Sequence, residues 1–444
     1  MADHPSPPEA GSDSPAPSRA SIDPDSPIDR WLIPVALFGL AWLVYAWINN
    51  GRTADLDYFV PLADAFLHGR LGLTEAPSWF NEVVRGRDGL FYVVYPPAPA
   101  VVLVPVVAIY GVGFPQEWAS ILLGALNVAI ASMVVRDMGV GRWTRIVLSL
   151  VFAFGTIVWF SAQAGSSWHF AHVVAMLFML LAIRACQLDA RPGLIGLLFA
   201  GAILSRLPLA VATPFFLAYL ADRAVREETL PPEVLAGQVF GSLRRTTERA
   251  WRSIPSPRPF LELATPFVAG LAIPLVMYLL YNAARFGSPA ENGYALIPGL
   301  LQEDQYRHGF FSIVNIPRKL YALFLTMPVQ AADFPWIQSR QLGGLSIVLT
   351  TPLFLWAIKA RRPDWFGIGA WVSIALILAP ILTHADTGGA QFGFRYAQDL
   401  YPFLFLLMIR GLGGRLSFEA WLAIAIGALV NVWGMGSTYY NWWA

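Results

Sequence analysis

Asp55 and Asp57 directly follow the first long apolar segment of the chain and are separated by a single leucine. A carboxylate at the end of a membrane segment is costly to desolvate, so a pair in this place is a candidate functional site. Two such carboxylates could accept a proton from a hydroxyl group, or stabilise the positive charge that develops on a reacting sugar ring. The structural alternatives are a solvated loop pair and a cap for the helix that follows.

The residues behind this pair predict a surface that faces water at a membrane boundary. Tyr58–Leu67 mixes apolar side chains with Asp64 in a spacing that suits a short helix lying along the membrane surface. Further on, Tyr95–Pro99 reads YPPAP, and we expect its prolines to direct the next segment and Tyr95 to contact substrate. The stretch as a whole predicts an acidic site at the outer surface of a polytopic membrane protein.

Three arginines could bind a phosphate group, because a guanidinium presents a planar fork to phosphate oxygens. Arg206 lies inside an apolar segment, directly before a Leu-Pro pair, and its alternative role is that of a membrane anchor. Arg395 precedes Tyr396, also a candidate substrate contact, and could instead pair with Asp399 one helical turn later. Arg307 belongs to an outer loop long enough to form a lid, and a plain solvated loop is the alternative.

Two histidines, His169 and His172, stand one helical turn apart at the start of an apolar segment. Such a pair can share a metal ion, and His384 with Asp386 could complete the site. Histidines in this position are more often hydrogen-bonded interface residues, and contact with substrate is the third alternative. No cofactor is therefore assigned, and a divalent metal is left open.

The composition is that of a protein built for lipid. Hydrophobic residues make up 56% of the 444 residues and charged residues 13%, whereas a soluble domain has about 25% charged residues. Many of the 17 tryptophans lie near the ends of apolar runs, as interface anchors do. The net charge is +1 and no basic, aromatic face is evident, so nucleic acid is not expected as a partner. The single cysteine, Cys186, excludes a disulfide framework and a cysteine metal site.

We expect two regions, a disordered cytoplasmic tail over residues 1–30 and a single integral-membrane domain over residues 31–444. The tail is rich in proline and serine and cannot bury enough apolar surface to order itself. It lacks the basic start of a cleaved signal peptide, so Trp31–Ile48 is expected to be a retained span. The later apolar runs are Gln116–Val135, Arg145–Ser161, Trp168–Cys186, Gly193–Leu220, Leu263–Ala284, Leu345–Ile358, Trp365–Leu382, Leu400–Ile409 and Phe418–Trp433.

Five clusters of basic residues lie between these runs, and the excess of Lys and Arg in cytoplasmic loops places all five inside. The largest is a basic loop over residues 222–262, which would face anionic lipid. Residues 49–115 and 285–343 then form outer loops, the first of them the catalytic loop. Nearly all the candidate site residues fall on this outer side.

The same rule decides two ambiguous segments. Ala98–Tyr110 is too short for the ~20 residues of a perpendicular span and contains prolines, so we expect it to be re-entrant or interfacial. Gly193–Leu220 must cross twice or not at all, because basic residues flank it on both sides. It is broken at Arg206-Leu207-Pro208, so we expect two half-spans that meet at Arg206 on the outer side. About 11 transmembrane helices result, in an all-α polytopic fold with the C-terminus outside.

At this point the sequence resembles the GT-C glycosyltransferases, polytopic enzymes that use lipid-phosphate-linked sugars. The relatives are the protein O-mannosyltransferases and the lipid A aminoarabinose transferase, whose first outer loop carries Asp-Glu-x-x-Tyr, a small-residue helix and then a Pro-Pro run. The matching residues begin with Asp55 and end with Pro96-Pro97. This sequence departs from the pattern at Leu56 and Phe59, and Asp57 supplies a carboxylate next to the missing one.

Two further stretches carry the resemblance. Gly201–Pro208 is similar to the family's Gly-x-x-x-x-Lys/Arg-x-Pro turn, which implies that Arg206 contacts the phosphate of the carrier lipid. Phe392–Tyr396, followed by a Tyr-Pro pair, resembles the family's Gly-x-Arg-Tyr run before a late helix. The resemblance implies a GT-C-like fold over most of residues 31–410, and places the two histidines where relatives carry an acidic residue.

The leading interpretation is an enzyme that transfers a hexose or pentose, with inversion, from a polyprenyl-phosphate donor to an acceptor on the extracytoplasmic face of a bacterial inner membrane. The acceptor would be a lipid, a glycan or a protein. One alternative is a lipid or solute transporter or flippase, although such proteins commonly show internal repeats and none is evident. Another is an outer-face glycan ligase or polymerase, which would need the arginines but not the aspartates of the first loop.

Overall fold

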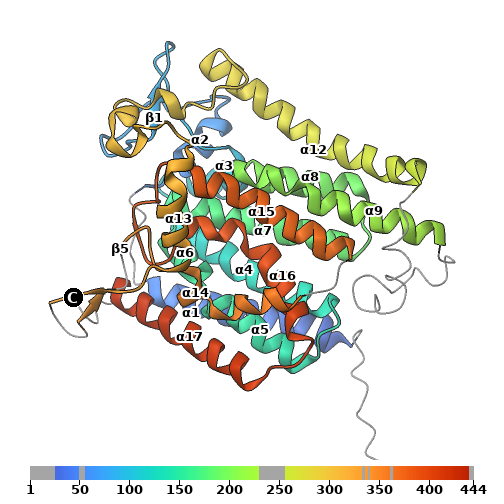
Figure 1. The fold of residues 1–444 in the computed structure, drawn as a ribbon. Helices are drawn as coiled ribbons and strands as arrows, with labels where there is room; N and C mark the ends of the chain where they lie inside the picture. The colour runs from blue at the N-terminus through green and yellow to red at the C-terminus, as the bar shows by residue number, and fades with distance from the viewer. Residues whose placement is uncertain are drawn as a thin grey trace, which may run out of the picture.

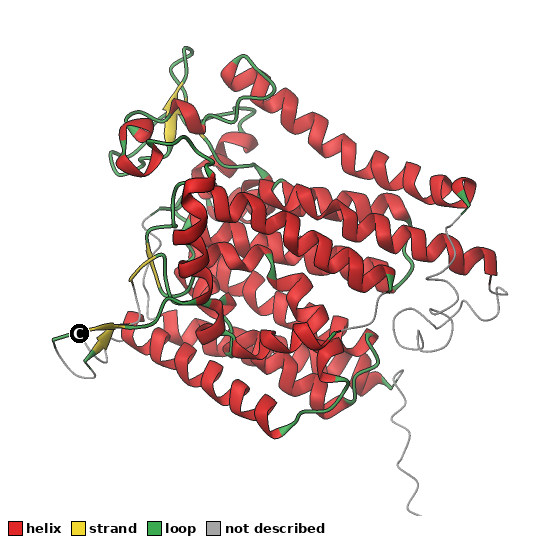
Figure 2. Ribbon diagram, viewed as in Figure 1, coloured by secondary structure: helices red, strands yellow, loops and turns green. Residues whose placement is uncertain are grey.

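The computed structural model of the chain describes residues 26–49, 56–229, 256–332, 336–338, 341–360 and 364–439. Within these ranges the chain is mainly helical, and its strands are short (Figure 2). The α-helices are α1 Ile33–Asn49, α2 Phe59–Leu67, α3 Ala98–Tyr110, α4 Gln116–Asp137, α5 Arg142–Phe154, α6 Val158–Ala164, α7 Ser167–Gln187, α8 Pro192–Ile203, α9 Thr213–Thr229, α12 Pro257–Phe286, α13 Ile316–Phe324, α14 Ile347–Thr350, α15 Trp365–Thr383, α16 Tyr401–Leu412 and α17 Phe418–Tyr439.

The described helices include 6 that are long and apolar enough to cross a membrane, and the pair α5 and α6, bent by 46°, raises the number to 7 if it forms one span. Three further helices, α3, α8 and α16, are apolar but shorter. The chain is therefore an all-α integral membrane protein, as its composition predicts. The count of eleven crossings stays a prediction, because several of the expected crossings are short or broken helices.

The long helices run side by side, and β1, α2, α13 and β5 gather at one end of the bundle, on the left of Figure 1. Described arginines of the predicted basic clusters, among them Arg142 and Arg410, lie at the opposite end. There Asp29 pairs with Arg142 at 2.5 Å, and Asp364 accepts hydrogen bonds from Arg410 at 2.7 and 2.8 Å. We refer below to the end that holds α2 and α13 as the loop end, and to the other as the arginine end.

Helix α3 begins at the loop end and does not carry the chain to the arginine end. The amide of Ala98, its first residue, donates to the carbonyl of Leu204 at 3.0 Å. After α3, helix α4 begins at Gln116, whose side chain accepts from the amide of Phe59 in α2 at 3.3 Å. Both ends of this connection therefore lie beside α2 or the α8–α9 turn, as expected for a re-entrant or interfacial segment.

Helices α8 and α9 form a hairpin whose turn holds Arg206. A 3-10 helix, Leu207–Ala212, follows the turn and leads into α9. At the far end of the hairpin, Arg223 donates to the carbonyls of Asp189 and Ala190 at 3.1 and 2.8 Å, so the chain returns to where it started. The structure thus agrees with two half-spans that meet at Arg206.

Small residues allow α8 to pack closely against α12. A Cβ atom at Gly196 would lie 2.1 Å from the carbonyl oxygen of Phe267, and one at Gly270 would lie 2.0 Å from that of Gly193. Such contacts between backbones are typical of membrane helices, where small residues rather than the hydrophobic effect permit close packing. This contact fixes α12 beside the hairpin that carries Arg206.

Three predicted boundaries differ from the structure. The tail was expected to run to residue 30, but Ile28–Leu32 is already helical, because Asp29 is held by Arg142 and its carbonyl accepts from Arg145 at 2.6 Å. Helix α9 extends to Thr229 and α12 begins at Pro257, so both ends of the predicted basic loop are helical. Residues 1–25 and 230–255 lie outside the described residues, as does Asp55.

The predicted span over residues 345–358 is only partly α-helical. It contains the short helix α14 and then a 3-10 helix, Pro352–Lys359, because proline interrupts the α-helical hydrogen bonds. Helix α16 packs against this 3-10 helix, so the segment is still an internal element of the bundle.

Short antiparallel strand pairs, which the sequence did not predict, organise the loop end. The strands are β1 Val83–Arg85 with β2 Phe91–Val93, β3 Val329–Gln330 with β4 Ile337–Gln338, and β5 Gln341–Leu342 with β6 Ala390–Gln391. The last pair joins the long outer loop to the segment before Arg395. It therefore holds α13 close to the candidate site.

Candidate active site

Tyr396 lies at the centre of three cations that come from three separate elements. The guanidinium of Arg395, its neighbour in the 3-10 helix Arg395–Asp399, lies 5.3 Å from the centre of the phenol ring. The guanidinium of Arg206, from the α8–α9 turn, lies 5.5 Å from the same centre, and the amine of Lys319, from α13, lies 5.2 Å from it. Two of the predicted residues, Arg206 and Arg395, are thus brought together with Tyr396.

Asp399 anchors Arg206 rather than Arg395. Its carboxylate accepts from Nη2 of Arg206 at 2.9 Å and from Nε at 3.3 Å, a two-point contact. The other neighbour of Asp399 is His172, whose Nδ1 lies 3.2 Å from Oδ1. The alternative that Arg395 pairs with Asp399 is therefore wrong, because the carboxylate faces α7 and the α8–α9 turn.

Lys319 is fully buried and was not expected from the sequence. Its amine donates to the backbone carbonyl of Asp386, whose side chain in turn accepts from the Tyr396 hydroxyl at 3.0 Å. Burial lowers the pKa of Lys319 to about 7. The signal that could have found it is an adjacent Arg318-Lys319 pair among apolar residues of an outer loop.

Within the described residues, no ion pair joins a carboxylate to Lys319 or Arg395. Arg395 is only 7% exposed and Lys319 is 0% exposed, so water does not solvate either charge freely. Two buried cations without a carboxylate in direct contact favour an anionic ligand, because an uncompensated buried charge is costly. The site is therefore suited to a phosphate group.

Glu82, just before β1, is a second residue that the sequence analysis missed. Its Oε2 accepts from the indole Nε1 of Trp168 at 2.5 Å, and its backbone amide donates to the Tyr58 hydroxyl at 3.4 Å. Burial raises the pKa of Glu82 to about 7. No local pattern marks this residue, because only the fold brings the first outer loop against the start of α7.

Trp168 connects Glu82 to the cations. The guanidinium of Arg395 lies over its ring, 5.2 Å from the centroid, while its Nε1 faces Glu82. The same Nε1 also contacts the hydroxyl of Tyr95, so the predicted contact Tyr95 belongs to this cluster. One indole thus contacts a carboxylate at its edge and a guanidinium over its face.

Aromatic rings line the space around Glu82. Tyr95 lies 5.6 Å from Tyr58 and 6.2 Å from Tyr294, measured between ring centroids. Tyr294 and Trp168 are partly exposed, whereas Tyr58 and Tyr95 are buried behind them. Amphipathic rings with polar tips suit a ligand that has both apolar faces and hydroxyl groups.

The two predicted histidines have different partners. His172 faces Asp399, whereas Nδ1 of His169 lies 3.0 Å from the Ser166 hydroxyl. Among the residues that the structure describes, no group of three His, Cys, Asp or Glu side chains could hold a metal ion. His384 contacts the backbone of Asp386 at 3.2 Å and does not complete a site with the other two.

Three other predicted residues, Arg307, Asp57 and Asp55, do not belong to the cation cluster around Tyr396. Arg307 is exposed, and its Nε faces Nε2 of His308 at 3.1 Å. Asp57 lies directly before Tyr58, whose pKa is raised to about 12 by burial and by the charges of Glu82 and Asp57. Asp57 is thus within electrostatic range of the Glu82 cluster, whereas Asp55 is not described.

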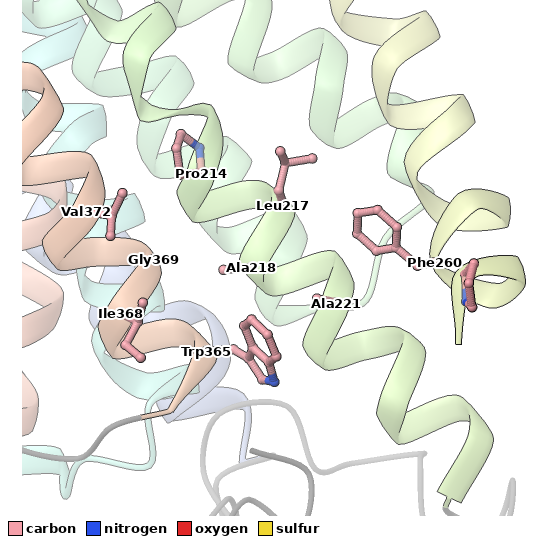
Figure 3. Close-up of a pocket in the computed structure, with 10 residues that line it drawn as sticks. Pro214, Leu217, Ala218, Ala221, Phe260, Trp365, Ile368, Gly369 and Val372 are labelled. Atoms are coloured by element: carbon pink, nitrogen blue, oxygen red, sulfur yellow. The ribbon is translucent and has the colours of Figure 1, made fainter. Parts of the chain in front are cut away.

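A separate apolar cavity of about 490 Å³ opens between α9, α12 and α15 (Figure 3). Leu217 and Phe260 face it from two of these helices, and Trp365 marks its end near the arginine end of the bundle. None of the residues that line it belongs to the cluster around Tyr396. The cluster around Tyr396 and this cavity are therefore at different places in the bundle.

Comparisons with known proteins give likeness in structure alone. No protein-family model and no curated protein matches the chain. It is similar to ArnT from Cupriavidus metallidurans bound to undecaprenyl phosphate, with 14% identity and a TM-score of 0.44 over 89% of this chain and 62% of that chain. It is also similar to the S. cerevisiae protein O-mannosyltransferase Pmt1-Pmt2 complex bound to the sugar donor, with 16% identity and a TM-score of 0.31 over 64% of this chain and 36% of that chain.

The chain spans less than two thirds of the length of either solved chain. These proteins are of the two kinds whose motifs the sequence resembles. The roles proposed below for Arg206, Arg395, Lys319 and Glu82 rest on contacts within this chain.

Proposed function

We propose that the protein is a membrane glycosyltransferase that moves a sugar from a polyprenyl-phosphate donor to a hydroxyl group of an acceptor. The observation that supports this proposal is the convergence of Arg206, Arg395 and Lys319 on Tyr396 at the loop end of the bundle. The charges of the cluster suit the reaction, because the leaving group is a phosphate, which needs cations rather than a proton donor.

The balance of charge around Tyr396 favours a negatively charged ligand. Asp399 compensates Arg206, and the carboxylate of Asp386 lies against the Tyr396 hydroxyl. Arg395 and Lys319 are then the groups best placed to receive phosphate oxygens. The Arg395 guanidinium is held by the rings of Trp168 and Tyr396, and the Lys319 amine by the Asp386 carbonyl and the Tyr396 ring. Little reorganisation is therefore needed when the donor binds.

The carboxylates of the first outer loop are proposed to act on the sugar and the acceptor, whereas the cations act on the phosphate. Glycosyl transfer with inversion needs a carboxylate to take the acceptor's proton and negative charge near the oxocarbenium-like ring. Asp55 and Asp57 are proposed to supply the negative charge near the ring, and the charge of Asp57 acts on Tyr58 in the aromatic cluster. The acceptor is proposed to be a lipid, a glycan or a protein.

The reaction is proposed to occur on the extracytoplasmic face of a bacterial inner membrane. The cluster around Tyr396 lies at the loop end, whereas the ion pairs of Asp29, Asp137, Asp189 and Asp364 with arginines lie at the other end. Since cytoplasmic ends are rich in Lys and Arg, the loop end faces outward in this proposal.

Purified protein incubated with a panel of polyprenyl-phosphate hexoses and pentoses tests the function. We expect at least one donor to release polyprenyl phosphate in the presence of an acceptor. Arg395→Ala should lose donor binding. The control is Arg258→Ala, whose side chain is 90% exposed in an i, i+4 ion pair, and this variant should bind donor as the wild type does. If no donor binds or reacts, or if Arg395→Ala binds donor as the wild type does, the proposal is wrong.

A further inference from the structure

Glu82 is a carboxylate of the loop end whose surroundings differ from those of an ordinary surface acid. It is partly exposed, yet its carboxylate is fixed by the Trp168 indole at 2.5 Å. Its backbone is fixed independently through the Tyr58 hydroxyl, which donates to Asn81 at 2.8 Å. The side chain is therefore held in place from two sides, as a group that must meet a substrate has to be.

Position relative to the cations separates Glu82 from Asp399 and Asp386. Asp399 is 0% exposed in its side chain and engaged by Arg206, and Asp386 accepts from Tyr396, which the three cations surround. Glu82 lies at the Nε1 edge of the Trp168 indole, whereas Arg395 lies over the face of that ring. In an inverting transfer the acceptor attacks the sugar carbon from the face opposite the phosphate, so the base must stand apart from the phosphate site.

We propose that Glu82 is a catalytic residue, the group that accepts the proton of the acceptor hydroxyl. This inference rests on the proposed glycosyltransferase function and names its base. The acceptor oxygen forms a bond to the anomeric carbon, the bond from that carbon to the phosphate oxygen breaks, and its electron pair leaves with polyprenyl phosphate. The hydroxyl proton goes to the Glu82 carboxylate and afterwards to water.

The first-loop aspartates then keep a separate role. Their negative charge stabilises the oxocarbenium-like ring, and the charges of both Glu82 and Asp57 act on the Tyr58 hydroxyl. Glu82 suits the proton transfer because a base is most effective when its pKa lies near the working pH. Its pKa of about 7, raised by burial, meets that condition.

The charged and titratable groups around Glu82 predict how its protonation responds to substitution. The hydrogen bond from Trp168 and the charge of Arg395 favour the carboxylate, whereas the like charges of Asp386 and Glu303 oppose it. The remaining titratable neighbours are the phenols of Tyr58, Tyr294 and Tyr306. Removing the Trp168 bond should therefore raise the pKa of Glu82, and removing the Glu303 charge should lower it.

The experiment measures transfer by the purified full-length protein, with the polyprenyl-phosphate sugar that the wild type uses, between about pH 5.5 and 9. For the wild type at saturating donor, kcat/KM for the acceptor should rise with pH through a limb near pH 7, because this quantity reports the base of the donor-bound enzyme before the acceptor binds. Glu82→Gln should lower kcat by about 100-fold or more with little change in donor binding. Glu75→Gln, an exposed glutamate of the same loop, should behave as the wild type.

Shifts in the pH at which activity rises distinguish a catalytic base from a residue that only supports the structure. Trp168→Phe should move the limb to higher pH and Glu303→Gln to lower pH, which loss of packing alone would not do. Activity of Glu82→Gln within threefold of the wild type, or a limb that neither neighbour variant moves, overturns this inference while the transferase function stands. A wild type that transfers no sugar from any donor in the panel overturns both.

Discussion

Arg206 and Asp399 form a buried two-point ion pair between the α8–α9 turn and the segment before α16, with Nη2–Oδ2 and Nε–Oδ1 distances of 2.9 and 3.3 Å. The side chains are 19% and 0% exposed. The pair ties a half-span hairpin to the element that carries Arg395 and Tyr396. It therefore fixes the geometry of the cation cluster in addition to supplying one of its charges.

Arg206→Ala is predicted to lower both stability and donor binding, because it leaves the Asp399 carboxylate buried with His172 as its remaining ionisable contact. Removing one partner of a buried pair typically costs about 3–5 kcal/mol. Thermal unfolding and donor titration measure the two effects, and Arg206→Lys should retain part of both. Arg258→Ala, at an exposed pair, should change the unfolding temperature little. Unchanged donor affinity in a well-folded Arg206→Ala protein would return Arg206 to the role of membrane anchor.

Asp399 also predicts how stability depends on acid. Burial would raise the pKa of its carboxyl, but Arg206 and His172 more than offset burial and lower the pKa to about 2. An aspartate in the unfolded chain has a pKa of about 3.9. The stabilisation of the folded state by the Asp399 carboxylate is therefore complete above that pH and is lost as the pH falls towards 2. Unfolding temperatures measured between pH 5 and 2.5 should fall less steeply for Asp399→Asn than for the wild type. An equal slope for both proteins would contradict the assignment.

The sequence predicted the parts of the fold that composition and charge determine. Apolar length and arginine clusters located the long spans, and Pro208 with the flanking basic residues located the turn at Arg206. These features are local, so they can be read along the chain. The same reasoning expected a regular span after Leu345, where the backbone instead becomes a 3-10 helix at Pro352.

Only those residues of the candidate site that stand in local sequence motifs could be predicted. Arg206, Arg395 and Tyr396 stand in recognisable local motifs, and the fold does bring them together. Lys319 and Glu82 stand in no such motif. Lys319 becomes a site residue because β5 and β6 hold its loop against the segment before Arg395, and Glu82 because α7 presents Trp168 to it. Contacts of this kind depend on tertiary structure.

Lys319 predicts a donor affinity that depends on pH. Burial lowers the pKa of its amine to about 7, so it is charged below and neutral above that pH. A phosphodiester donor keeps its negative charge throughout, and its affinity should fall by about tenfold between pH 6 and 8.5, the equivalent of about 1.4 kcal/mol. Lys319→Arg should bind donor without this pH dependence, because arginine stays protonated. Lys319→Met should bind weakly at both pH values; if it binds like the wild type, Lys319 does not contact the phosphate.

The orientation of the bundle predicts which end can be labelled from outside the cell. Cysteines replace Glu75 at the loop end and Arg191 at the arginine end, both exposed, in a protein whose buried native thiol has been removed by Cys186→Ala. An impermeant thiol reagent should label Glu75→Cys in intact cells and Arg191→Cys only after lysis. Thr53→Cys, in the stretch next to Asp55, should label as Glu75→Cys does. The reverse pattern would invert the topology and exclude an extracytoplasmic reaction.

The first-loop aspartates are predicted to differ in their effect on turnover. Asp55 matches the first acidic residue of the family motif, whereas Asp57 stands where that motif has no acid. Loss of a carboxylate that stabilises only the transition state lowers kcat and leaves ground-state binding intact, whereas loss of a positioning group mainly weakens binding. We therefore expect Asp55→Asn to abolish turnover with donor binding intact, and Asp57→Asn to be milder.

The pH profile distinguishes these aspartates from the proposed base. With Glu82 as proton acceptor, the residual activity of Asp57→Asn should keep a limb near pH 7, because the pKa that sets this limb belongs to Glu82. If Asp57→Asn were instead the inactive variant, the motif would be shifted along the chain and Asp57 would take the role assigned to Asp55. If both variants transferred sugar at the wild-type rate, the acidic pair would have no part in the reaction, and the resemblance in the first outer loop would lose its chemical meaning.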